Sequence, residues 1–275
     1  MEKTEKTKSS FWGKMTAAPH ILWSVMFILA PLLFVIYYSF TDANGAFTFE
    51  NILALEEHTN TFFLSVSLSV IATFICFLIG YPLAYFIASY KEKSQKIMIT
   101  LLMLPMWTNL LIRTYSMMAI MDDGGFLNTV LGALNLGKVH LIGTKGAVIF
   151  GMVYDFLPYM VLPIYTIISK LDVSLTEAAR DLGCSQFQVV RKVILPLSKA
   201  GIISGITMVF VPSISTFYIS QKLGGGTFEL IGDTIERQFQ NISTYNVGAA
   251  ISLVMMILVL LSLAIMNRFS EEEAG

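Results

Sequence analysis

Two ionisable side chains, Arg113 and Asp155, fall inside long apolar stretches of the sequence. A charge in such surroundings is costly, so it usually faces the interior of a helix bundle and finds a partner. Three arrangements are open. The two groups form a structural ion pair with each other, or they line a path on which Asp155 attracts a cation. Otherwise one or both lie near a membrane edge and reach water.

Aromatic side chains cluster near the same positions in the sequence. They are Trp107, Tyr115, Tyr154, Tyr159, Phe217 and Tyr218. Aromatic faces can hold an ammonium group by cation–π contact, which is one function open to them. An interfacial belt or a packed core is the structural alternative, as for most aromatic residues of membrane proteins.

Signatures of catalysis are missing from the sequence. No G-x-x-x-x-G-K-[ST] phosphate-binding loop occurs, and His20, His58 and His140 match no metal spacing. No nucleophile motif or catalytic triad stands out. We therefore expect neither an enzyme nor a metal or cofactor site in this chain.

The elements that must position these residues are membrane helices. The chain is 55% hydrophobic and only 13% charged, about half the charged share of a soluble protein. A helix needs about 20 apolar residues to cross a bilayer. Six runs meet this length, and they predict an all-α, polytopic membrane protein with six transmembrane helices. The runs are 20–40, 62–89, 97–121, 146–169, 201–221 and 247–267.

Lys and Arg predict the orientation. Of the 18 basic residues, 13 fall on the side of the two termini, four fall on the opposite side, and Arg113 lies within a span. The positive-inside rule then predicts a cell-membrane protein with both termini on the cytoplasmic side. The predicted layout is a cytoplasmic tail (1–19), a first helix (20–40), a five-helix core (62–267) and a second cytoplasmic tail (268–275). A net charge of −1 argues against nucleic acid as a partner.

The stretch 171–196 between the fourth and fifth spans has local signals for two short helices. Ser174 with Glu177 fits a capping box, and Gly183 suits the left-handed position after a helix. Ser185 with Gln188 fits a second box, and Pro196 marks the end of the second helix. By composition alone, this stretch also fits a solvated or interfacial loop. Alternatively, the stripe of small and apolar residues on its first helix suits docking into a groove of a partner protein.

The residues of this stretch resemble a known signature. Glu177, Ala178 and Ala179, followed by Gly183 and then by Ile194-Leu195-Pro196, are similar to the EAA signature of permease subunits of binding-protein-dependent ABC importers. The resemblance implies the type I importer transmembrane fold. It also implies that 171–196 is a coupling segment for a cytoplasmic ATPase. The residues it assigns to coupling are Glu177, Ala178, Ala179, Asp181, Gly183 and Pro196.

The same resemblance implies the partners and cofactors. They are a second related permease, a dimeric ATPase that holds ATP and Mg²⁺, an extracytoplasmic binding protein and the surrounding lipid. Within the family, some segments resemble polyamine (spermidine/putrescine) permeases of the B type: 105–115, Gly80–Ala84, Phe217–Tyr218, Gly224–Gly226 and Leu230–Gly232. This similarity implies that Asn109 and the aromatic residues named above are candidates for the substrate path.

One residue departs from the pattern, since Asp155 stands where an apolar residue is expected. It implies either altered substrate contacts or a local ion pair. Two alternatives to a polyamine permease remain open at this point. One is an importer permease for another small solute, such as an amino acid or a phosphonate. The other is a membrane interaction scaffold.

Overall fold

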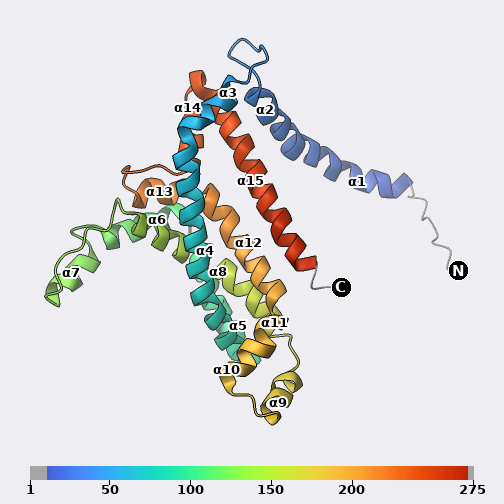
Figure 1. Cartoon of the computed structure of the whole chain (residues 1–275), viewed down its shortest axis with the longest axis vertical. Coiled ribbons are helices and arrows are strands. Elements are labelled where there is room, and N and C mark those ends of the chain that lie inside the picture. The colour runs from blue at the N-terminus through green and yellow to red at the C-terminus, as the bar shows by residue number, and fades with distance from the viewer. Residues whose placement is uncertain (1–10, 272–275) are drawn as a thin grey trace. The chain divides into compact units, whose positions relative to one another are not determined.

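The computed structural model describes residues 11–271, which form helices joined by loops (Figure 1). Within these residues, four helices are long and apolar enough to cross a membrane. Two bent helix pairs raise the number to six if each pair is one span. The predicted all-α membrane fold is thus confirmed. The single spans are Ala18–Ser39, Glu50–Ala88, Lys145–Ile168 and Ile242–Met266, and the pairs are Glu92–Trp107 with Leu110–Ala133 and Gln186–Leu197 with Lys199–Ser215.

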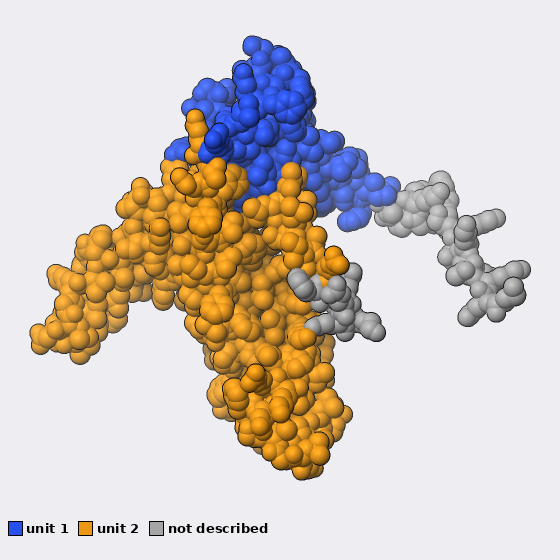
Figure 2. All heavy atoms as spheres, in the orientation of Figure 1, with its two compact units in different colours: residues 1–56, 237–255 blue, residues 57–236, 256–275 orange. Residues whose placement is uncertain are grey.

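The chain divides into two compact units, which Figure 2 colours separately. The first unit comprises residues 1–56 and 237–255, and the second comprises 57–236 and 256–275. In the first unit, α1 (Phe11–Ser24) continues through one π-helical turn into α2 (Ala30–Ser39). The same unit holds the short helix α3 (Glu50–Leu53) and the start of the last helix, α15 (Tyr245–Glu271).

The second unit is built on three helices that lie side by side in Figure 1. They are α4 (Thr59–Ala88), α8 (Lys145–Ile168) and α12 (Lys199–Ser215). Small residues let α12 approach α8 closely. A Cβ atom on Gly201 would lie 2.9 Å from the Pro163 carbonyl oxygen, and one on Gly205 would lie 3.0 Å from that of Met160. The first distance is too short for a Cβ atom and the second is unusually tight, so the absence of a side chain at both positions favours this close packing.

The third predicted span is not one continuous helix, and this prediction was wrong. Residues 97–121 are divided between α5 (Glu92–Trp107) and α6 (Leu110–Met121), and the helical axis bends by 91° at the break. Thr108 and Asn109 between them are extended. Apolar composition alone cannot reveal such a break, because residues on both sides of it are apolar.

The fifth predicted span, 201–221, is also shorter than expected. Helix α12 ends at Ser215, three residues after Pro212, and Thr216 is extended. A separate short helix, α13 (Tyr218–Leu223), follows. The remaining helices are α7 (Phe126–Ala133), α9 (Val173–Asp181), α10 (Gln186–Val189), α11 (Leu195–Leu197) and α14 (Ile231–Gln240).

Candidate functional site

The two ionisable residues of the predicted spans meet in the structure. The Arg113 guanidinium on α6 forms an ion pair through Nε with Oδ1 of Asp155 on α8. Asp155 is 1% exposed, and the side chain of Arg113 retains 12% exposure. Of the three arrangements that the sequence left open, the ion pair is therefore the one present. Neutralisation by Arg113 makes the buried carboxylate tolerable within a membrane helix.

Arg113 also bridges the break between α5 and α6. Its Nη1 donates a hydrogen bond of 2.7 Å to the Pro105 carbonyl oxygen in the last turn of α5. That oxygen also accepts from Thr108 Oγ1 at 2.6 Å. A cation at the C-terminal end of a helix is favourable, because the last carbonyls point towards it. Arg113 thus stabilises the break and Asp155 at the same time.

The start of α6 has its own cap. The Asn109 side-chain oxygen accepts a 2.8 Å hydrogen bond from the Leu111 N–H. Backbone groups inside a membrane need such partners, since no water is present to replace them. Asn109 therefore caps a helix, in addition to the role in the substrate path that the family resemblance implies.

Only some of the aromatic candidates come together. The rings of Tyr115 on α6 and Tyr218 on α13 lie 6.2 Å apart, edge to face. Among the described residues, no ring contact joins Trp107, Tyr154 or Phe217 to another aromatic side chain. These three are largely exposed on the surface of the chain. Asp155, by contrast, is buried and paired with Arg113.

The segment 171–196 folds as two short helices, as predicted, but its first cap differs. Asp172 is the N-cap of α9, and its carboxylate accepts from the Ser174 N–H at 2.9 Å. This hydrogen bond lowers the pKa of Asp172. The predicted capping box of Ser174 with Glu177 was therefore wrong, because the chain enters the helix two residues earlier. The second predicted box, Ser185 with Gln188, is confirmed.

Polar contacts hold the segment against α4. The Gln186 side-chain amide donates to the Tyr85 hydroxyl, and Arg180 donates to Gln186 at 2.9 Å. Ala179 of α9 is buried together with Val189 and Ile194. Helix α10 continues through one π-helical turn (Val190–Ile194) into α11, which ends at Leu197, one residue after Pro196, as the proline predicts. The segment is therefore anchored on one face.

The opposite face of the segment is open. Glu177, Ala178, Asp181 and Gly183 are exposed, and Gly183 has the left-handed φ of +80° that its position predicts. Leu182 and Phe187 are 86% and 72% exposed. Apolar side chains left in this state on a rigid projection are typical of a docking surface.

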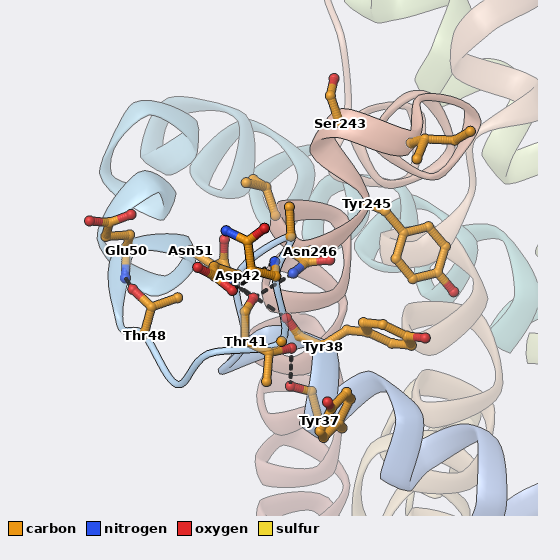
Figure 3. A pocket seen from close by; sticks show the side chains of 15 residues that line it. Tyr37, Tyr38, Thr41, Asp42, Thr48, Glu50, Asn51, Ser243, Tyr245 and Asn246 are labelled. Atoms are coloured by element: carbon orange, nitrogen blue, oxygen red, sulfur yellow. Dashed lines mark hydrogen bonds between the residues drawn. The ribbon is translucent and has the colours of Figure 1, made fainter.

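The first unit contains a polar cavity of about 760 Å³, shown in Figure 3. The Thr41 carbonyl oxygen at its wall accepts hydrogen bonds from the side-chain amides of Asn51 (2.8 Å) and Asn246. Asp42 folds the adjoining loop by accepting from the Asn44 and Ala46 N–H groups at 2.9 and 2.8 Å. Sequence reasoning missed both amides: the Asn246 contact with Thr41 spans 205 residues of sequence, and the Asn51 contact with Thr41 depends on how the loop between them folds.

A second buried carboxylate was missed as well. Asp233 of α14 accepts hydrogen bonds from the Leu230 N–H at 2.7 Å and from Ser220 Oγ at 2.9 Å. Burial nevertheless raises the pKa of Asp233 to about 6. Nearby, Ser65 of α4 accepts from the Ile231 N–H at 2.8 Å. The cluster fixes the loop before α14, and its only sign in the sequence is an acid next to Gly232.

Comparison with known proteins agrees with this geometry. Residues 78–272 match the family described as binding-protein-dependent transport system inner membrane component. The chain is 38% identical to the spermidine/putrescine transport system permease protein PotB of Haemophilus influenzae, over 93% of both chains. It is 37% identical to PotB of Escherichia coli, over 90% of this chain and 94% of that one.

Solved structures show the same fold at low sequence identity. A bacterial ABC transporter involved in the import of the acidic polysaccharide alginate contains a chain with a TM-score of 0.78 and 17% identity. The match covers 95% of this chain and 96% of that one. A chain of the MetNI methionine ABC transporter gives a TM-score of 0.58 at 18% identity, covering 78% and 94%.

Proposed function

Because the chain belongs to the family of binding-protein-dependent transport system inner membrane components, we propose that it is a permease subunit through which polyamines are imported. The observation that carries the substrate is the identity of 37–38% to the PotB permeases over at least 90% of the chain. The permease contains no catalytic site of its own.

The anchored face and the open face of 171–196 support a role in coupling the permease to an ATPase. One face is fixed to α4 through Gln186 and Tyr85, and the other presents Glu177, Leu182 and Phe187 to a partner. A segment held in this way transmits a movement of the ATPase to α4 without bending. In the proposed complex, a cytoplasmic ATPase dimer binds ATP and Mg²⁺, and this chain binds neither.

The path for the cargo lies, in this proposal, along the exposed aromatic side chains rather than at Asp155. The Asp155 carboxylate is buried and already paired, so an ammonium would have to displace Arg113 to reach it. Tyr115, Tyr218, Trp107, Tyr154, Tyr159 and Phe217 keep accessible surface. A second, related permease would close the path on its open side, and an extracytoplasmic binding protein would deliver the cargo.

A reconstituted importer tests the proposal. The chain is purified with its genomic partners, a second permease and an ATPase, and placed in proteoliposomes with the binding protein. We expect ATP-dependent uptake of radiolabelled spermidine or putrescine, and no uptake of methionine or a phosphonate. Uptake of the latter solutes alone would assign the permease to another substrate. Failure of any ATPase to copurify with the chain would favour a membrane scaffold.

A further inference from the structure

Lys222 lies close to the rings of Tyr115 and Tyr218, the two tyrosines of the second unit that contact each other. The Lys222 ammonium is 5.2 Å from the centre of the Tyr115 ring and 5.7 Å from that of Tyr218. Lys222 follows Tyr218 by one turn of α13, and α13 packs against α6, which carries Tyr115 (Figure 1). All three residues belong to the same compact unit.

Both rings lie within the range at which an aromatic face attracts a cation. The rings meet edge to face, with an angle of 79° between their planes, so the two tyrosines form two walls of a corner around one ammonium. The corner is open, because Tyr115 is 47% exposed. A small cation arriving from outside can therefore reach the place that the Lys222 ammonium occupies.

The group held in this corner is a primary alkylammonium. The ends of putrescine and spermidine carry the same group on the same kind of methylene chain. Cation–π attraction depends on charge and size, so a site that holds a lysine ammonium also suits a polyamine end. The tethered lysine competes at an effective concentration that is in the millimolar range for a short connection.

From this geometry we infer that Tyr115 and Tyr218 form a binding station for a primary ammonium of the cargo, and that Lys222 occupies the station when cargo is absent. The inference rests on the proposed function, since it requires a cargo with a primary ammonium. Arrival of a polyamine releases Lys222 from the rings. The lysine then acts as an internal competitor that keeps the station filled between transport cycles and weakens cargo binding.

The competition is tested by equilibrium binding of radiolabelled putrescine to the permease–ATPase complex in nanodiscs, without the binding protein. Lys222→Gln removes the charge and keeps the length, so the dissociation constant should fall by about 2- to 30-fold. Lys222→Arg keeps a cation and should resemble the wild type. Lys145→Gln is the matched control, because Lys145 is an exposed lysine at the start of α8 and, among the described residues, its ammonium contacts no aromatic ring.

The rings are tested in the Lys222→Gln chain. Tyr115→Leu should cancel the gain in putrescine binding, whereas Tyr115→Phe, which keeps the ring, should retain most of it. Unchanged or weaker binding after Lys222→Gln, or an equal gain after Lys145→Gln, overturns the inference while polyamine import by the wild type still stands. A wild-type importer that takes up no polyamine overturns the proposed function and this inference together.

Discussion

Arg113 shows how one side chain can serve two structural features of a membrane protein. Its Nε side neutralises Asp155, and its Nη1 group satisfies the Pro105 carbonyl at the end of α5. Without Arg113, Asp155 would be a buried charge with neither water nor a partner, whereas the Pro105 carbonyl would keep its hydrogen bond from Thr108. Removing one member of a buried pair costs about 3–5 kcal/mol, because the other charge is left unpaired.

Asp155→Asn should therefore destabilise the protein rather than only slow transport. We expect a lower thermal unfolding temperature in detergent and less complex assembled with the ATPase. A second change in the same chain, Arg113→Gln, should restore much of the stability, since both charges are then gone. Normal stability of Asp155→Asn combined with lost polyamine uptake would contradict this view and return Asp155 to the path.

Asp233 should make the stability of the fold depend on pH with a sign opposite to that of an ordinary salt bridge. Its pKa is raised from 3.8 to about 6 by burial, so the folded state prefers the protonated acid. The free energy of unfolding should then fall as pH rises from about 4 to about 6. Two pKa units correspond to about 3 kcal/mol as the largest loss.

Asp233→Asn should remove this dependence. The amide oxygen can accept from the Leu230 N–H, and the amide nitrogen can donate to Ser220 Oγ, so the local hydrogen bonds survive. The measurement is the unfolding temperature of the purified chain at pH 5 and at pH 7.5. The wild type should lose more stability between these values than the variant, and equal losses would show that Asp233 is not responsible.

Among the elements, the segment 171–196 contains one residue with a left-handed backbone conformation. Gly183 has φ of +80°, and a Cβ atom there would meet nothing within 4 Å. A substitution is therefore strained by the backbone alone and not by a clash. For a residue with a Cβ atom, this conformation costs about 1–2 kcal/mol, and asparagine tolerates it better than most.

Gly183→Val should leave the protein in the membrane but reduce the ATPase activity that the loaded binding protein stimulates. Gly183→Asn is the matched variant and should keep most of that activity. Copurification of the ATPase with each variant separates loss of docking from loss of transmission. Full stimulation in the valine variant would show that the left-handed turn is not needed for coupling.

The spans and the two short helices of 171–196 could be predicted because their signals are local. Twenty apolar residues, a capping box at Ser185 and a glycine after a helix act over short stretches of chain. The break at Thr108–Asn109 could not be predicted, because Pro105 alone does not break a membrane helix. One contact that stabilises the break is the hydrogen bond from Arg113, four residues beyond it, to Pro105. The ion pair and the contact of Lys222 with Tyr115 join separate helices, and no local pattern contains them.

At the scale of the whole molecule, topology is the property that the charge distribution predicts. Alkaline phosphatase is active only outside the cytoplasm, so fusions report the side of each loop. A fusion after Gly137 should be active, and one after Gly183 should be inactive, if both termini are cytoplasmic. The reverse pattern would place Glu177 and Gly183 away from any ATPase, and it would contradict both the orientation and the coupling role.

The pairing of Arg113 with Asp155 has an electrical consequence for the whole transporter. A single charge that moves through the membrane field gains or loses about 2.3 kcal/mol per 100 mV. Here the cation and the anion are joined on neighbouring helices of one unit and sum to zero, so they move together when these helices move. The membrane voltage therefore does no net work on this pair during the transport cycle, and it acts instead on the charge of the cargo.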